Sequence, residues 1–437
     1  MLRIPTQVIA TLAVTLSLDV VAWSQTQGIY LSLPESLPQK SAAETGVLSA
    51  STSPKVPRPI TQVAPESQKN LTTNRATQEA PSLLGAKSTH PDFQKDQGQK
   101  PKRSGEFVAA PIPIFSPTIK SGLVFVGGYI FPFSKKDKVS PPSMIGGVGF
   151  ATSNDSWAAG LGGRIYFKEN RYRATVGGGS GAVYFNLYGV GPGAGDKGQS
   201  VPVVTRGKFF FAEFLRNVGW NVFVGPRYQM AQLKAGLVVS TSRPDIDELL
   251  KNLFKARHSA LGFRVLRETR DNTFYPKHGG QLDMIGDFFA QSLGSKFTYQ
   301  SYSFSINRYG SFARNQVIAY RFTACGVNGR APFYALCKFG VSNDLRGYEG
   351  GRYLDRRMFA TQIEYRLVLP KRFGLVGFGG IGEVAPSVGR FNYDNLLPSG
   401  GGGLRFRISK SNHINFRIDY GIGKNGHTWS MGVGEAF

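Results

Sequence analysis

The sequence is poor in the residues that catalysis and metal binding usually require. Its 437 residues include only two cysteines and five histidines. The histidines show no metal-ligand spacing, no Gly-x-Ser-x-Gly elbow occurs, and no nucleophile–base set is visible. We therefore expect no enzyme activity, no metal and no cofactor.

Long apolar runs are also missing. Beyond Ser24 none reaches the roughly 18 to 20 residues of a transmembrane helix. Residues 1–24 have the features of a signal peptide: Arg3 precedes an apolar stretch from Val8 to Leu18, and Ala22 and Ser24 are the small residues that a signal peptidase reads. A membrane anchor is the alternative, but the apolar run is short. We predict an exported chain whose signal peptide, residues 1–24, is cleaved; Asp19 leaves the cut site open by several residues.

Aromatic residues are absent from Leu31 to Asp92, where Pro, Ser, Thr and Gln recur. Such a stretch cannot bury enough apolar surface to offset its chain entropy. We predict that residues 25–106 form a disordered linker. It would serve as a spacer or as a tether for a periplasmic partner.

From Phe107 onward the chain alternates in character over segments of about ten residues, separated by Gly, Pro and Asn turns, as in a transmembrane barrel. Phe416, Ile418 and Tyr420, for example, alternate with polar residues. An exported chain with no helical span can still cross a membrane as a closed barrel. We predict an all-β fold for residues 107–437, a transmembrane antiparallel β-barrel of about 16 strands.

The end of the chain separates this barrel from a soluble sandwich, which would alternate too. Trp429, Met431, Val433 and Phe437 share one face by parity, and Phe437 is the last residue. A terminal aromatic residue is typical of outer-membrane barrels, so Phe437 is the expected C-terminal barrel signal. One helix is predicted from Ser242 to Arg257 on the periplasmic side, because its apolar residues recur at helical spacing.

The segment from Asp344 to Tyr353 reads DLRGYEGGRY and lies in a long loop. It resembles the (V/L)-R-G-(F/Y) motif of the bacterial surface antigen superfamily, the barrels of BamA- and TamA-like proteins and two-partner secretion translocators. Three further segments, beginning at Thr269, Ile363 and Gly434, resemble the family's "RD…P…G" turn, "E-Y-R" strand and usual ending. The resemblance covers the C-terminal 170 residues well and implies that the motif lies in an extracellular loop between strands eleven and twelve.

The resemblance also implies that this loop folds into the barrel. The loop-motif residues are Leu345, Arg346, Gly347 and Tyr348. A cation in a confined space needs a carboxylate partner, and Glu364 is inward by parity. Relatives supply a second carboxylate from an "F-x-D-x-G" strand, where this chain has Gly380; half of the usual pairing is therefore expected to be missing.

Family insertases carry POTRA modules before the barrel, whereas this sequence offers only the linker. The resemblance implies an outer-membrane protein that assists insertion or translocation of polypeptides, with unfolded clients or a periplasmic accessory protein as partners, besides outer-membrane lipid and lipopolysaccharide. Two alternatives stay open: an anion-permeable pore, and a plugged structural surface antigen.

The formal charge of +24 could suggest nucleic-acid binding, but export excludes that partner. Most of the excess falls in the barrel, and five arginines are inward by parity: Arg321, Arg366, Arg405, Arg407 and Arg417. They would attract anions, or form cross-braces with four acidic residues: Glu364, Asp283, Asp287 and Asp419.

The two cysteines of this exported chain, Cys325 and Cys337, flank an apparent turn between adjacent strands. A disulfide between them is the default expectation. Closing so short a loop would contribute about 2 to 3 kcal/mol.

Overall fold

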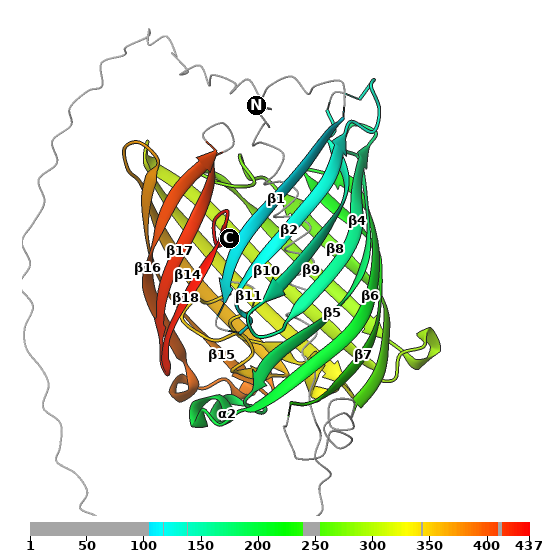
Figure 1. Cartoon of the computed structure of the whole chain (residues 1–437), viewed down its shortest axis with the longest axis vertical. Coiled ribbons are helices and arrows are strands. Elements are labelled where there is room, and N and C mark those ends of the chain that lie inside the picture. Colours follow the sequence, from blue (N-terminus) through cyan, green and yellow to red (C-terminus); the bar gives the residue numbers. More distant parts are fainter. Residues whose placement is uncertain (1–104, 117, 138, 239–253, 342–343, 410–412) are drawn as a thin grey trace, which may run out of the picture. The chain divides into compact units, whose positions relative to one another are not determined.

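The computed structural model describes residues 105–116, 118–137, 139–238, 254–341, 344–409 and 413–437. These residues form a closed antiparallel barrel of sixteen strands, with a separate two-stranded sheet, β12–β13, between barrel strands eleven and twelve (Figure 1). The predicted fold class is confirmed. The predicted signal peptide and nearly all of the predicted linker lie outside the described residues.

Among the described residues, the first half of the barrel contains eight strands and one short helix. These elements are β1 (Glu106–Ser116), β2 (Lys120–Phe131), β3 (Ser143–Thr152), β4 (Trp157–Phe167), β5 (Tyr172–Leu187), α2 (Pro192–Lys197), β6 (Val201–Gly219), β7 (Val222–Leu237) and β8 (Phe254–Glu268).

The second half contains the remaining strands and four short 3-10 helices. These elements are β9 (Gly279–Phe289), η1 (Gln291–Leu293), β10 (Tyr299–Ala313), β11 (Gln316–Gly329), η2 (Phe333–Ala335), β12 (Cys337–Lys338), β13 (Leu354–Asp355), β14 (Arg357–Val368), β15 (Phe373–Ala385), η3 (Val388–Arg390), η4 (Tyr393–Asn395), β16 (Leu397–Ser409), β17 (Ile414–Gly423) and β18 (Gly426–Val433). None of the helices in the described ranges is long and apolar enough to span a membrane.

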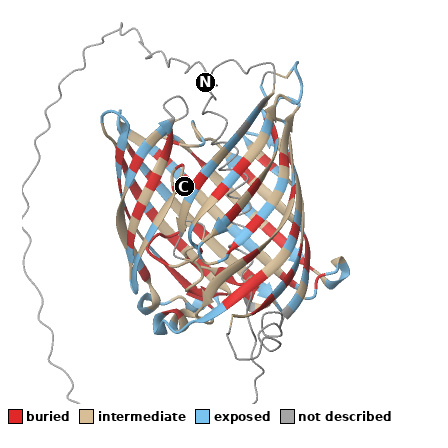
Figure 2. Ribbon diagram, in the orientation of Figure 1, coloured by how far each residue is buried: buried red, intermediate tan, exposed pale blue. Residues whose placement is uncertain are grey.

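Along each strand, inward and outward side chains alternate, because successive residues of a strand point to opposite faces (Figure 2). On β14, Ile363 and Tyr365 are exposed on the outer wall, whereas Glu364 and Arg366 are buried in the lumen. Exposed apolar residues thus cover the outside, where lipid would lie, and the charged residues of this strand lie inside.

The two ends of the barrel differ in the length of their connections. At one end β6 and β7 are joined by Trp220 and Asn221 alone, and β10 and β11 by Arg314 and Asn315. At the other end lie the connections 188–200 and 330–356. Outer-membrane barrels have short periplasmic turns and longer extracellular loops. The end that carries the Arg346 loop is therefore the extracellular one.

Two expectations need correction here. Phe254 to Arg257, the end of the predicted helix, belong to strand β8, where Ala256 and His258 point inward and Lys255 and Arg257 outward. Ser242 to Leu253 lie outside the described residues. The β7–β8 connection leaves the barrel at the same end as the Arg346 loop, since both follow odd-numbered barrel strands, so its periplasmic placement is wrong.

The predicted count of about sixteen strands is confirmed. The first of them, β1, contains Pro111 and Pro113, which obscure the strand pattern in the sequence.

Candidate functional site

The long connection between β11 and β14 folds back into the barrel. We call residues 339–353 the plug loop. β12 and β13 pair at its base, where Cys337 lies opposite Asp355. The loop buries its aromatic and aliphatic side chains: Phe339, Leu345, Tyr348 and Tyr353. It is therefore packed inside the barrel rather than exposed above it.

Arg346 of the plug loop is held by three side chains of the barrel wall. Its guanidinium donates to Gln362 Oε1 at 3.0 Å, to the Glu364 carboxylate, and to Asp419 Oδ2 at 3.2 Å. One face of the guanidinium lies over the Phe378 ring, 3.6 Å from its centroid. A buried arginine is tolerated only when its charge and donors are matched in this way. The structure thus places Arg346 in the lumen beside Glu364.

Gly347 explains why the loop can approach the wall so closely. Its φ of +104° is a conformation that residues with a side chain rarely adopt, and a Cβ here would lie 2.9 Å from the Ile422 carbonyl group. The Ser399 hydroxyl donates to the carbonyl oxygen of Arg346. Tyr348 donates its hydroxyl to the Pro398 carbonyl at 2.6 Å. The motif residues therefore fix the loop against β16 and β17.

The second carboxylate that seemed to be missing comes from another strand. Gly380 points into the lumen, but a Cβ there would lie 2.6 Å from Leu345 Cδ1 and 2.2 Å from the Thr361 carbonyl oxygen. Asp419 on β17 supplies the carboxylate instead. The expectation of a half-empty pairing was wrong, because it considered only β15.

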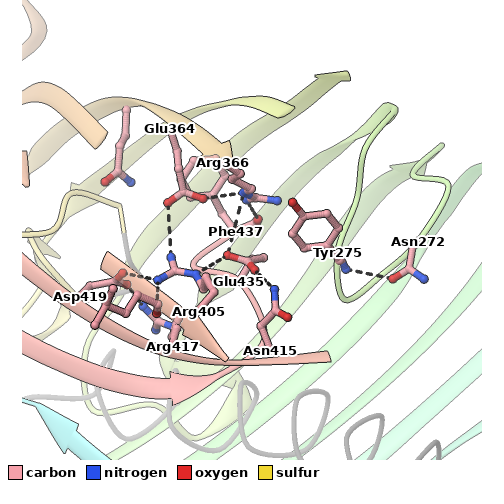
Figure 3. A network of polar contacts seen from close by, with 12 residues as sticks. Asn272, Tyr275, Glu364, Arg366, Arg405, Asn415, Arg417, Asp419, Glu435 and Phe437 are labelled. Atoms are coloured by element: carbon pink, nitrogen blue, oxygen red, sulfur yellow. Dashed lines mark hydrogen bonds and ion pairs between the residues drawn. The ribbon is translucent and has the colours of Figure 1, made fainter. Parts of the chain in front are cut away.

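Arg346 is joined through Glu364 and Asp419 to a wider network of buried charges, whose other members are labelled in Figure 3. The network contains four arginines and three carboxylates, namely Arg346, Arg366, Arg405, Arg417, Glu364, Asp419 and Glu435. Glu364 accepts from Arg366 at 2.6 Å, and Asp419 accepts from Arg405 at 2.6 Å and from Arg417 at 2.8 Å. Shared partners offset the cost of burying so many charges.

The two other arginines that were predicted to face the lumen also have neighbours. Arg321 donates to Asn307 Oδ1 at 3.1 Å, and the Arg407 guanidinium lies 5.9 Å from the centroid of the Tyr275 ring. Two of the predicted acidic braces are paired elsewhere in the lumen, Asp283 with Arg264 at 2.8 Å and Asp287 with Arg227 at 3.3 Å. These contacts favour cross-bracing over an unpaired anion-attracting lumen.

The end of the chain departs from the expected outward face. β18 ends at Val433, and Gly434, with a φ of +91°, turns the chain into the lumen. Phe437 is buried against Tyr309 and Ala319, and its main-chain oxygen accepts from Arg366 Nη2 at 2.8 Å. Phe437 does not share the outer face of Trp429, because strand parity stops before it.

Cys325 and Cys337 form a disulfide. The bond links β11 of the wall to β12 at the base of the plug loop. The two cysteines do not flank a simple turn between adjacent barrel strands, because the barrel neighbour of β11 is β14. The disulfide ties the entrance of the plug loop to the wall.

The outer side of the plug loop is held by α2. Tyr353 donates its hydroxyl to Asp196 Oδ1 at 2.8 Å, and Arg352 Nε donates to the Gly195 carbonyl at 3.0 Å. Lys424, in the β17–β18 turn, pairs with Asp196 Oδ2 at 3.0 Å. The plug loop is thus held on its lumen side by the buried charges, and at its extracellular side by this cap of α2 and the β17–β18 turn.

Sequence reasoning missed part of this site. It did not assign Gln362 or Phe378 to Arg346, and it named Asp419 only as a general brace. The alternation of inward and outward residues along β14, β15 and β17 could have identified all three as lumen residues, since each occupies an inward-facing position of its strand.

The lumen is not filled everywhere. A cavity of about 420 Å³ lies on the β6–β11 side, next to the disulfide. Charged residues of both signs line it, among them Arg264, Asp283, Arg321 and Asp344.

A model of the Omp85 superfamily domain matches residues 205–437. The chain belongs to the Omp85 superfamily. As a member with a closed sixteen-stranded barrel, it is an outer-membrane protein.

Two solved barrels show the same fold. BamA from Haemophilus ducreyi lacking POTRA domains 1–3 matches with 14% identity and a TM-score of 0.52, covering 76% of this chain and 70% of that one. CdiB from Escherichia coli matches with 10% identity and a TM-score of 0.51, covering 74% of this chain and 62% of that one. No functionally curated protein matches the chain. At these identities the structures support the fold of this Omp85 member and no finer role.

Proposed function

We propose that this Omp85 barrel assists the insertion or translocation of polypeptides at the outer membrane, and that clients engage the seam between β1 and β18. The observation that carries the proposal is the weakness of this seam. β1 and β18 are neighbours in the barrel (Figure 1), and among the described residues they share one register pair, Phe115 with Met431, near the end of β1. On its other side β1 pairs with β2 along its whole length, from Glu106 to Ser116.

Within the described residues, most of the edge of β1 that faces β18 therefore has no strand partner. Unpaired backbone groups are costly inside a membrane, so a strand that covers them is stabilised. An incoming client strand would do this by β-augmentation. The relatives named BamA and CdiB are barrels of the same fold, which is consistent with such a role.

Two prolines of β1 support the same interpretation. Pro111 and Pro113 lack an N–H group, and their spacing of two puts the missing donors on one edge of the strand. Because β1 pairs with β2 through both positions, the loss is expected on the β18 edge. The prolines would keep the seam from closing with a full set of hydrogen bonds.

The test is to lock the seam. A Phe115→Cys/Met431→Cys variant, made in a Cys325→Ser/Cys337→Ser background, is reconstituted in liposomes. A urea-unfolded eight-stranded outer-membrane barrel is then added, and its folding is followed by its heat-dependent shift on SDS gels. We expect the protein to accelerate folding, the oxidised variant to lose the acceleration, and a reductant to restore it.

The matched control places the cysteines at Leu123 and Ala151, which pair across the continuous β2–β3 ladder. This cross-link should leave the acceleration unchanged. Equal folding rates with and without the wild-type protein would contradict the proposal.

The cavity beside the disulfide is the observation that supports one alternative function, a pore for small anions. The same liposome-reconstituted protein can be studied by single-channel recording. A steady anion-selective conductance without any acceleration of client folding would favour the pore.

A further inference from the structure

The outer wall carries a cluster of cations at the extracellular ends of β6, β7 and β8. They stand in two rows across neighbouring strands. In the first row Arg206 pairs in register with Lys234, and Lys234 with Lys255. In the second row Lys208 and Arg257 both pair with Gln232. We call these five cations and Lys296 the outer basic patch; Lys296 joins them from the β9–β10 connection, where its Nζ donates to the Lys255 carbonyl oxygen at 3.3 Å.

The patch faces away from the lumen. On β6 Arg206 and Lys208 occupy alternate positions, and the next residue, Phe209, is buried inside the barrel. On β7 Lys234 lies between the buried residues Leu233 and Ala235. On β8 Arg257 precedes the buried His258 and contacts Met230 on the neighbouring strand at 3.5 Å. All five strand cations therefore project toward the surrounding membrane.

Among the residues that the structure describes, no carboxylate forms an ion pair with a member of the patch. The lumen shows the opposite arrangement, since there arginines and carboxylates are interleaved. Like charges opposite one another on a sheet are destabilising unless an anion lies between them.

The patch lies at the edge of the apolar band. On the periplasmic side of the patch, Phe210 and Phe214 of β6 are exposed, and the outer face of β8 continues with Leu261, which is 51% exposed. The bands end at the periplasmic side with the exposed residues Arg216 and Arg267. The patch is therefore level with the lipid headgroups of the extracellular leaflet.

We propose that the outer basic patch binds the phosphate groups of the phosphorylated glycolipid of the outer leaflet, the lipid A part of lipopolysaccharide. Arginine offers paired donors to a phosphate and lysine a compact charge, and the patch contains both. Neighbouring strands are about 4.8 Å apart and alternate residues about 6.8 Å apart along a strand, so two rows of cations can surround more than one phosphate. Acyl chains below these phosphates would lie on the apolar band. The site is independent of client handling at the seam.

The test compares the wild-type protein with an Arg206→Gln/Lys234→Gln/Lys255→Gln variant in detergent containing EDTA. The matched control removes three outward cations at the periplasmic end, in an Arg216→Gln/Arg267→Gln/Arg308→Gln variant. Binding of diphosphoryl lipid A, monophosphoryl lipid A and phosphatidylethanolamine is measured by native mass spectrometry. Heat-dependent gel mobility confirms that each variant is folded.

We expect the patch variant to bind diphosphoryl lipid A about a hundredfold more weakly than the wild type or the control, since it lacks three cations and each cation near an anionic surface contributes on the order of 1 kcal/mol. The wild type should also bind the diphosphoryl form more tightly than the monophosphoryl form. Equal affinities of the patch and control variants, or equal wild-type affinity for phosphatidylethanolamine, would overturn the proposal. Should the patch variant fail to fold, the wild-type comparison of the three lipids decides the matter alone.

Discussion

The walls on the two sides of the seam are stabilised in different ways. The wall formed by β14 to β18 is cross-braced by the buried network around Glu364 and Asp419. The wall formed by β1 to β5 instead buries apolar side chains on its inner face, such as Val124 and Phe150. Glycines do not distinguish the two walls, because both bring them opposite one another, as at Gly160 and Gly179 in one wall and at Gly379 and Gly400 in the other.

This difference has a physical consequence for the seam. Charge-assisted hydrogen bonds are directional and fix the relative positions of strands, whereas contacts between apolar side chains are non-directional and leave neighbouring strands freer to shift. One side of the seam is therefore stiff and carries the plug loop, and the other can adapt its curvature. We expect an opening at the seam to be accommodated by β1 to β5.

The largest expected effect is the loss of a charge in the braced wall. Arg346→Ala and Glu364→Ala should each destabilise the barrel by about 3 to 5 kcal/mol, because each leaves an unmatched buried charge. Combined, the two changes should cost much less than their sum. Urea unfolding followed by gel mobility measures this, and protease sensitivity of the plug loop shows where the effect lies.

The control for this cycle is Asp283→Ala, which breaks a separate ion pair with Arg264. Its effect should simply add to that of Glu364→Ala. If Arg346→Ala and Glu364→Ala were also additive, the two residues would not act as a pair.

A smaller effect is expected from overpacking a glycine in the wall formed by β1 to β5. A Cβ at Gly179 would lie 2.4 Å from the Ala159 carbonyl oxygen, so Gly179→Val should cost about 1 to 3 kcal/mol in unfolding free energy. Gly310→Val on β10 is the matched control, since a Cβ added there would meet open space, with nothing within 4 Å apart from its chain neighbours. Equal stabilities of the two variants would show that the close packing of this wall is not required.

The smallest effect is expected at the cap on the plug loop. Burial raises the pKa of Asp196, but hydrogen bonds from Lys424, Asn425 and Tyr353 outweigh it, so the pKa lies below its ordinary value of 3.8. A lowered pKa means that the contribution to stability is present above about pH 4 and is lost as the pH falls through the folded-state value. Because the pair is about a third exposed, Asp196→Asn should cost under about 1 kcal/mol, and less in high salt.

The measurement is protease sensitivity of the plug loop at neutral pH and at about pH 3, below the ordinary pKa of an aspartate. Asp196→Asn should raise the sensitivity at neutral pH and remove most of the difference between the two pH values. An unchanged pH dependence would assign the effect to another acid.

The barrel and its inward arginines could be predicted from sequence because strand parity is a local property. Arg366, Arg405 and Arg417 needed only the alternation of two residues to be placed in the lumen. The loop motif was also readable, since Gly347 and its neighbours form a contiguous pattern.

What the sequence did not provide were contacts set by the closure of the barrel. Asp419 reaches Arg346 because β17 follows β16 around the wall, a relation that no spacing within one strand reveals. The prediction that Phe437 lies on the outer face was wrong because it extended the alternation of the strand past Gly434, where the backbone turns into the lumen. The end of the predicted helix was placed wrongly because apolar residues at helical spacing also fit the start of a strand, which here begins at Phe254.

The charge network also ties the plug loop to the last strands of the barrel. Asp419 and Glu435 come from β17 and from the segment after β18, whereas three of the arginines come from the plug loop, β14 and β16. Without these two carboxylates, Arg346, Arg366 and Arg405 would share Glu364 as their one carboxylate in this network. A barrel without β17 and β18 is thus destabilised by excess positive charge in its lumen, so the plug loop is held in the lumen only when these strands are in place.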